Sequence, residues 1–324
     1  MKAIVHERYG SPDVLELKDI DPPVVDDDSV LVRVRAASVN AYDWHMMRGL
    51  PFLVRMSEGL RTPKQTAMGV DVAGQVESVG KKVTQFRPGD EVFGARTGSL
   101  AEYVRGGPKS FLVPKPANLT FEQAAAVPMA ATTALQGLRD KGQLKPGQRV
   151  LVNGASGGVG TFAVQIAKAF GAHVTGVCST RNVEMVRSIG ADQVVDYTRD
   201  DFTRSEQRYD LILDVAANRS LSDCRRVLVP SGVLVIVGAP PDGRRTTPIV
   251  ARLLTAVVSS RFSSKKMLPF LAKNSKEDLI VLRELIEGGK VTPVIDRTYP
   301  LNEAAEAMRY IETGHARGKV VITV

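Results

Sequence analysis

Residues 150–160 read Val-Leu-Val-Asn-Gly-Ala-Ser-Gly-Gly-Val-Gly, and this order of residue types decides the fold. An apolar run leads into three evenly spaced glycines, Gly154, Gly157 and Gly160, and a helix-forming run follows over residues 161–170. Glycine lets the backbone turn sharply and approach a pyrophosphate, and the start of a helix offers unpaired N–H groups and the positive end of the helix dipole. The stretch therefore predicts a phosphate-binding strand, turn and helix.

The pattern downstream of this turn alternates between strand and helix. An ordinary strand–helix turn is the simplest alternative for three glycines, but a place within a series of βαβ units favours a dinucleotide. Such a series predicts a doubly wound parallel sheet. We expect further strands at residues 173–178, 194–197, 210–215, 233–238 and 266–273, and helices at 182–189, 221–229 and 277–287.

The first 120 residues have a different texture, with short strand-like runs separated by glycine turns, which is typical of a barrel-like β domain. A capping box, Thr120 with Gln123 three residues on, predicts the start of a helical region. Strand character returns in the last 35 residues, so we expect the tail to rejoin the first domain. The predicted domains are 1–121 completed by 290–324, with 122–289 inserted.

The composition is ordinary for a soluble globular protein of 324 residues. No apolar run is long enough to span a membrane, and the N-terminus has no apolar segment of the kind found in signal peptides. The two cysteines, Cys178 and Cys224, do not indicate a disulfide scaffold. We expect a protein of a reducing compartment, the cytoplasm.

The net charge of +8 comes from scattered basic residues rather than long blocks, so a solvated surface is favoured over nucleic-acid binding. Residues 244–268 are harder to interpret, because apolar residues recur there at helical spacing between basic ones. They could form a lid, a dimer contact or a basic helix on a membrane surface. Packing on the chain itself or on a dimer partner is the favoured interpretation, since most amphipathic faces cover a core.

Several segments in order resemble the zinc-free medium-chain dehydrogenase/reductase family, in its quinone oxidoreductase (zeta-crystallin-like) group. The resemblance implies an α/β protein with a GroES-like β-barrel catalytic domain and an inserted Rossmann domain with a doubly wound parallel sheet. The segments that carry it are residues 37–44, 69–74, 88–94, 131–134, 154–160 and 315–321.

Zinc-dependent relatives carry a cysteine near the position of Asn40 and Gly-His-Glu where this chain has Gly69-Val70-Asp71. The first hundred residues contain no cysteine, and the four histidines are widely spread. A zinc site needs clustered nitrogen or sulfur ligands. We therefore expect no metal.

The end of the second strand of the inserted domain distinguishes the two nicotinamide cofactors. A site for NADH places Asp or Glu there, to bind the ribose hydroxyls. This chain has Ser179, Thr180 and Arg181, which could bind a 2′-phosphate, although Arg181 could also simply begin the next helix in solvent. The absence of an acid in this segment favours NADPH.

The resemblance adds further site residues. In the pocket segment it suggests Asn40, Tyr42 and Asp43 as catalytic candidates, where Asp43 could equally cap the helix that follows. It implies that Tyr197 lies near the 2′-phosphate or the adenine, and that Arg317 and Lys319 approach the cofactor from the tail. The full set predicted to bind the cofactor is Thr133, Ser156, Gly157, Gly158, Val159, Ser179, Thr180, Arg181, Tyr197, Gly238, Ala239, Arg317 and Lys319.

The leading hypothesis is a homodimeric NADPH-dependent enzyme that transfers hydride to a small electrophile, a quinone or an α,β-unsaturated carbonyl compound. Without zinc, the acceptor must already be electron-poor. Two alternatives stay open: an NADPH-binding regulatory or interaction protein with little turnover, and a zinc-free reductase or dehydrogenase of simple aldehydes or alcohols. No dedicated proton donor can be identified from the sequence.

Overall fold

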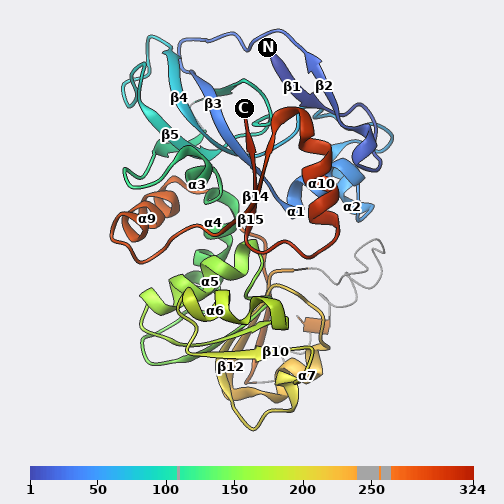
Figure 1. Ribbon diagram of the computed structural model, residues 1–324, viewed down its shortest axis with the longest axis vertical. Coiled ribbons are helices and arrows are strands. Elements are labelled where there is room, and N and C mark those ends of the chain that lie inside the picture. The colour runs from blue at the N-terminus through green and yellow to red at the C-terminus, as the bar shows by residue number, and fades with distance from the viewer. Residues whose placement is uncertain (108–109, 239–254, 257–263) are drawn as a thin grey trace. The chain divides into compact units, whose positions relative to one another are not determined.

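The computed structural model describes residues 1–107, 110–238, 255–256 and 264–324, and the chain divides into two compact units (Figure 1). Ala239 and most of the predicted amphipathic stretch lie outside the described residues. Unit 1 consists of Met1–Ala130, Asn274–Gly288 and Pro293–Val324, and unit 2 of Ala131–Lys273 and Gly289–Thr292.

The unit boundaries differ from the predicted ones at helix α9, Lys276–Glu287, which belongs to unit 1 rather than to the inserted domain. Hydrogen bonds explain the difference. The Asn118 side chain donates to the carbonyl oxygen of Ile286 at 2.9 Å, and the backbone N–H of Ala117 donates to Glu287 at 3.3 Å. These bonds attach the end of α9 to a loop of unit 1.

The main sheet of unit 1 is built around β3, Val30–Val39, which pairs antiparallel with β15, β4 and β6. The strand order is β14-β15-β3-β4-β5-β7, and β1 and β2 form a separate antiparallel pair. The remaining bounds are β1 Lys2–Val5, β2 Glu16–Asp19, β4 Asp71–Val79, β5 Glu91–Ala95, β6 Tyr103–Gly106, β7 Phe111–Pro114, β14 Ile295–Pro300 and β15 Lys319–Thr323.

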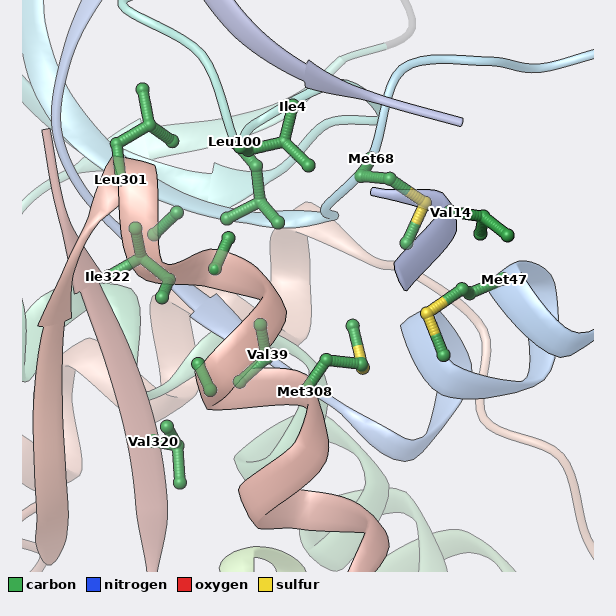
Figure 2. Packing of buried hydrophobic residues seen from close by; sticks show 13 residues of the cluster. Ile4, Val14, Val39, Met47, Met68, Leu100, Leu301, Met308, Val320 and Ile322 are labelled. Atoms are coloured by element: carbon green, nitrogen blue, oxygen red, sulfur yellow. The ribbon is translucent and has the colours of Figure 1, made fainter. Parts of the chain in front are cut away.

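The tail rejoins the first domain, as predicted, because both its strand and its helix α10, Ala304–Glu312, contribute to the core of unit 1. Figure 2 shows Met308 of α10 close to Val39 of β3, with Val320 of β15 beside them. Ile4 of β1 belongs to the same cluster. Burial of these apolar side chains holds the two ends of the chain in one unit.

Unit 2 contains the predicted doubly wound parallel sheet, which the structure confirms with the strand order β10-β9-β8-β11-β12-β13. The order reverses between β8 and β11, because β9 and β10 extend the sheet on one side and β11 to β13 on the other. The bounds are β8 Arg149–Asn153, β9 His173–Cys178, β10 Gln193–Asp196, β11 Tyr209–Asp214, β12 Leu228–Ile236 and β13 Lys266–Pro269.

The predicted capping box at the start of α3 is also confirmed: the backbone N–H of Gln123 donates to Thr120 Oγ1, and that of Thr120 to Gln123 Oε1. Among the described residues, no helix combines the length and the apolar character that a membrane crossing requires. The other helices are α1 Ala41–Arg48, α2 Leu53–Glu58, α3 Phe121–Ala125, α4 Pro128–Gln136, α5 Gly158–Ala169, α6 Val183–Ser188 and α7 Leu221–Arg226. Short 3-10 helices are η1 Pro12–Val14, η3 Thr180–Asn182, η4 Phe202–Arg204 and η5 Leu301–Glu303, and η2 Gly137–Lys141 is a π-helix.

Candidate active site

The loop between β8 and α5 has the geometry of a phosphate-binding turn. Gly154 has a φ of +91°, a conformation that L side chains rarely adopt. A Cβ at Gly160 would lie 2.0 Å from the carbonyl oxygen of Gly154, so only glycine allows this close packing of helix on loop. Because α5 begins directly after Gly157, the unpaired N–H groups of its first turn are available to an anion.

This loop lies where the strand order of unit 2 reverses, which is where doubly wound sheets bind their ligands. Polar side chains join the two strands at that point. Asn153, the last residue of β8, donates to Asp214 at 2.8 Å and to Asn218 at 2.9 Å, and Asp214 also accepts from the backbone N–H of Ala217. The loop and its position fit a dinucleotide.

A buried asparagine that the sequence did not point to connects the loop with the end of β9. Asn182 is 4% exposed, and its Nδ2 lies 3.0 Å from Ser156 Oγ and 3.2 Å from Ser179 Oγ. Two serines predicted to bind different parts of the cofactor are therefore held by one side chain.

Thr180 has a partner that could not be recognised in the sequence, because the acid follows from β10 rather than from the end of β9. The register of β10 places Asp196 opposite Cys178, and the Thr180 hydroxyl donates to Asp196 at 2.6 Å. Thr198 donates to the same carboxylate from its hydroxyl at 2.8 Å and from its backbone N–H at 3.0 Å. The hydrogen bond from the Thr180 hydroxyl lowers the pKa of Asp196 most, and the two hydrogen bonds from Thr198 lower it further.

The other predicted cofactor residues of unit 2 have separate positions. Arg181 is exposed on the turn after β9, and Tyr197, at 42% exposure, follows β10. Thr133 is buried within α4. Gly238 follows β12, and its backbone N–H donates to the carbonyl oxygen of Asp214. Val159 lies in the first turn of α5, partly buried.

The two predicted tail residues, Arg317 and Lys319, differ in environment. Arg317 is exposed, and its backbone N–H donates to the Asp296 carboxylate at 2.7 Å. The hydroxyl of Tyr310 donates to the same carboxylate. Lys319 is only 3% exposed, and its ammonium group binds Asn40 Oδ1 and lies near Asp71. The structure thus gives Lys319 partners within unit 1, and its predicted approach to the cofactor stays a prediction.

Asp71 is the centre of this buried network in unit 1. Its Oδ2 accepts from the hydroxyl of Ser38 at 2.8 Å and from the Asn40 side chain at 3.0 Å, and its Oδ1 accepts from the backbone N–H of Met129 at 3.0 Å. Burial lowers the pKa of Lys319, while the carboxylates of Asp71 and Asp43 oppose that effect. Both polar ends of the Asn40 side chain are therefore bound within the protein.

Asp43 is a buried carboxyl group beside this network. Asp43 was predicted to precede the helix and cap it, but α1 begins at Ala41, so Asp43 lies in the first turn. It still caps this end of the helix, because its carboxylate accepts from the backbone N–H of Asn40 at 2.8 Å. Burial and the nearby Asp71 raise the pKa of Asp43 to about 7, against the lowering effects of Asn40 and Lys319. A carboxyl group with this pKa exchanges protons near neutral pH.

Asp43 lines a pocket of about 250 Å³ in unit 1. Tyr42, about 40% exposed, lines it too, and burial, with Glu58 and Asp43, raises the pKa of its hydroxyl. His6 lines it as well, and its buried Nδ1 has no hydrogen-bond partner in the part of the chain that the structure describes. The remaining lining residues are Tyr9, Met46, Glu58, Pro63, Gln65, Ala67, Met68, Gly69, Val70 and Thr97.

In the described part of the chain, no three His, Cys, Asp or Glu residues lie together in a way that could hold a metal ion. The position where zinc-dependent relatives carry a cysteine holds Asn40, whose amide is bound to Asp71 and Lys319.

Comparison with known proteins finds two families that match parts of the chain. The family of alcohol dehydrogenase GroES-like domains matches residues 26–117, in unit 1, and the zinc-binding dehydrogenase family matches residues 189–322. The quinone oxidoreductase from Coxiella burnetii has a similar structure, with a TM-score of 0.85, 31% identity and coverage of 100% of this chain and 99% of that one.

Full-length relatives are oxidoreductases. The mitochondrial NAD(P)H oxidoreductase RTN4IP1 of Mus musculus is 36% identical, with coverage of 100% of this chain and 89% of that protein. The chloroplastic NADPH-dependent alkenal/one oxidoreductase of Arabidopsis thaliana is 35% identical, with coverage of 99% and 79%. The chain therefore belongs to the quinone oxidoreductase-like group of the medium-chain dehydrogenases/reductases, and it is an oxidoreductase that uses a nicotinamide cofactor.

Proposed function

We propose that the protein is an NADPH-dependent reductase of quinones or α,β-unsaturated carbonyl compounds that works without zinc. Unit 2 would bind the cofactor, and the pocket of unit 1 would bind the acceptor. The name of the Arabidopsis relative, which includes both NADPH and alkenal/one, supports this combination.

The turn after β9 supports NADPH. Arg181 is exposed there and Ser179 is half-buried, so this turn carries a cation and a hydroxyl, the two kinds of group that bind a 2′-phosphate. Asp196 adds a negative charge nearby, but its oxygens accept hydrogen bonds from Thr180 and Thr198, which reduces its effect on a bound phosphate.

The single observation that carries the proposed chemistry is the position of Asp43, a buried carboxyl group that lines the pocket of unit 1. When bound, the reduced nicotinamide supplies a hydride. A quinone or an enone that has taken up hydride needs one proton, on the quinone oxygen or on the enone α-carbon. Asp43 lines the pocket with a pKa raised to about 7, so it holds a proton in a large fraction of molecules at neutral pH.

Tyr42 supports the same chemistry. A tyrosine hydroxyl keeps its proton at neutral pH, and burial raises the pKa of Tyr42 further, so Tyr42 can donate a hydrogen bond to the oxygen on which negative charge develops. Asn40 acts indirectly, since its side chain is bound to Asp71 and Lys319 and its backbone N–H holds Asp43.

A panel of acceptors tests the proposed function. Purified protein is incubated with NADPH and one acceptor, which is a 1,4-quinone, a short enone or a simple aldehyde. Alcohol oxidation is measured separately with NADP⁺. Each reaction is run with and without a zinc chelator. We expect oxidation of NADPH with quinones or enones at a rate that the chelator leaves unchanged. Turnover of simple aldehydes alone, binding of NADPH without turnover, or activity that zinc restores after chelation would each contradict the proposal.

The role of Asp43 is tested by its pH profile. In the wild type, kcat for the acceptor should fall as the pH rises through about 7. Asp43→Asn should lower kcat by about 100-fold at pH 6.5 and remove this dependence. Asp21→Asn, at an exposed position, is the matched control and should keep the wild-type profile. An unchanged profile in Asp43→Asn would mean that protons reach the product by another route.

A further inference from the structure

Asn182 occupies a position between two loops of the proposed cofactor site. It ends η3 and precedes α6, and its buried side chain reaches Ser156 in the glycine loop and Ser179 at the end of β9. An amide NH₂ carries two hydrogens, one for each hydroxyl oxygen. The two contacts thus use the full donor capacity of the side chain.

These contacts determine where the serine hydroxyls can point. A hydroxyl whose oxygen accepts a hydrogen bond directs its own hydrogen elsewhere, and neither serine hydroxyl has another hydrogen-bond partner among the described residues. Both hydrogens are therefore available to an acceptor outside the protein. Phosphate oxygens are strong acceptors of this kind.

Thr180 shows the opposite arrangement one residue from Ser179. Its hydroxyl donates to Asp196, so its hydrogen is directed back into the protein. The difference between Ser179 and Thr180 arises from their partners: an amide donor for the serine and a carboxylate acceptor for the threonine.

The amide has a cost that packing alone does not explain. Asn182 Oδ1 is buried and has no hydrogen-bond partner in the described part of the chain. A buried acceptor without a partner destabilises a fold, and an apolar side chain would avoid this. The amide at residue 182 therefore points to a role in binding rather than in stability.

We propose that Asn182 is a positioning residue, which orients the Ser156 hydroxyl toward the pyrophosphate of NADPH and the Ser179 hydroxyl toward its 2′-phosphate. This inference rests on the proposed use of NADPH. The amide orients both donors and adds no charge to a site for a polyanion. It also couples the two phosphate subsites through one side chain.

A mutant cycle with measured dissociation constants tests the inference. We measure Kd for NADPH and NADH in the wild type, in Asn182→Ala, in the Ser156→Ala/Ser179→Ala double variant and in the triple variant. Asn182→Ala should weaken NADPH about tenfold or more, and NADH less, because only NADPH engages both serines. Without the two serine hydroxyls, Asn182 has nothing left to orient. The Kd values of the double and the triple variant should therefore differ by less than about twofold.

Equal losses from Asn182→Ala in the presence and absence of the two serine hydroxyls would overturn the inference and indicate a purely structural role. If Asn182→Ala fails to fold, Asn182→Asp gives the same test, since a carboxylate accepts from both hydroxyls and turns their hydrogens inward. It should weaken NADPH in the wild-type background more than in the background without the serine hydroxyls.

The control is Ser188→Ala, on the exposed surface of α6, where the hydroxyl donates to the Met185 carbonyl oxygen. Its Kd values should match those of the wild type. Failure of the proposed function is distinguishable: equal affinities of the wild type for NADPH and NADH would refute the NADPH preference, while the coupling of Asn182 to Ser156 would still be measured with NADH.

Discussion

The ammonium group of Lys319 lies 3.5 Å from Oδ2 of Asp71, and the two side chains are only 4% and 0% exposed. Lys319 begins β15, the last strand of the chain, and Asp71 begins β4. Between them, Asn40 donates to Asp71 and accepts from Lys319. The tail is thus attached to the first domain by charge as well as by apolar packing.

Lys319→Met should destabilise the protein by about 3–5 kcal/mol, because it leaves the Asp71 carboxylate buried without its cation. The measurement is the free energy of unfolding from urea denaturation. Lys81→Met, at an exposed position, is the control and should change this energy by no more than about 0.5 kcal/mol. A loss below about 1 kcal/mol for Lys319→Met would show that the pair contributes little.

The raised pKa of Asp43 makes a prediction about stability and pH. In the unfolded chain this carboxyl group has an ordinary pKa of 3.8, while in the folded protein the pKa is about 7, so the folded state binds more protons between these values. Its contribution to stability is therefore fully present below about pH 4 and is lost as the pH rises through 7, by at most roughly 4 kcal/mol.

The difference between wild type and Asp43→Asn isolates this effect from other titrating groups. The stability of the wild type relative to Asp43→Asn should fall from pH 4.5 to pH 8 in urea denaturation experiments. A difference that stays constant or rises over this range would show that the carboxyl group is already ionised in the folded state at acid pH.

The two glycines Gly160 and Gly157 should respond differently to alanine. A Cβ at Gly160 would lie 2.0 Å from a backbone oxygen, whereas at Gly157 the nearest atom would be 3.7 Å away. Gly160→Ala should therefore lower the free energy of unfolding by about 2–3 kcal/mol or more, and Gly157→Ala by much less. Equal effects in thermal denaturation without cofactor would contradict the close packing of α5 on its loop.

The fold could be predicted from local sequence patterns to a large extent. The glycine spacing after an apolar run identified the turn between β8 and α5, and strand–helix alternation identified the parallel sheet. Helix α9 was placed in the wrong unit, because its attachment depends on hydrogen bonds from Asn118 and Ala117, which lie far away in the sequence.

The site was predictable only where its residues are close in sequence. Ser179, Thr180 and Arg181 could be proposed together because they follow one strand directly, and their role in binding stays a prediction. Asp196 was missed because only the register of β10 on β9 brings it to Thr180. The partners of Lys319 could not be predicted, because a basic residue near the chain end gives no sign that Asp71 and Asn40 surround it.

The preference for NADPH over NADH is the most direct test of the central claim. The measurement is kcat/KM for each cofactor with one quinone acceptor, in the wild type and in Arg181→Ala. We predict that the wild type prefers NADPH, and that Arg181→Ala lowers kcat/KM for NADPH about tenfold or more while changing the value for NADH less than about twofold. Equal use of both cofactors by the wild type, or equal losses for both in Arg181→Ala, would contradict the account.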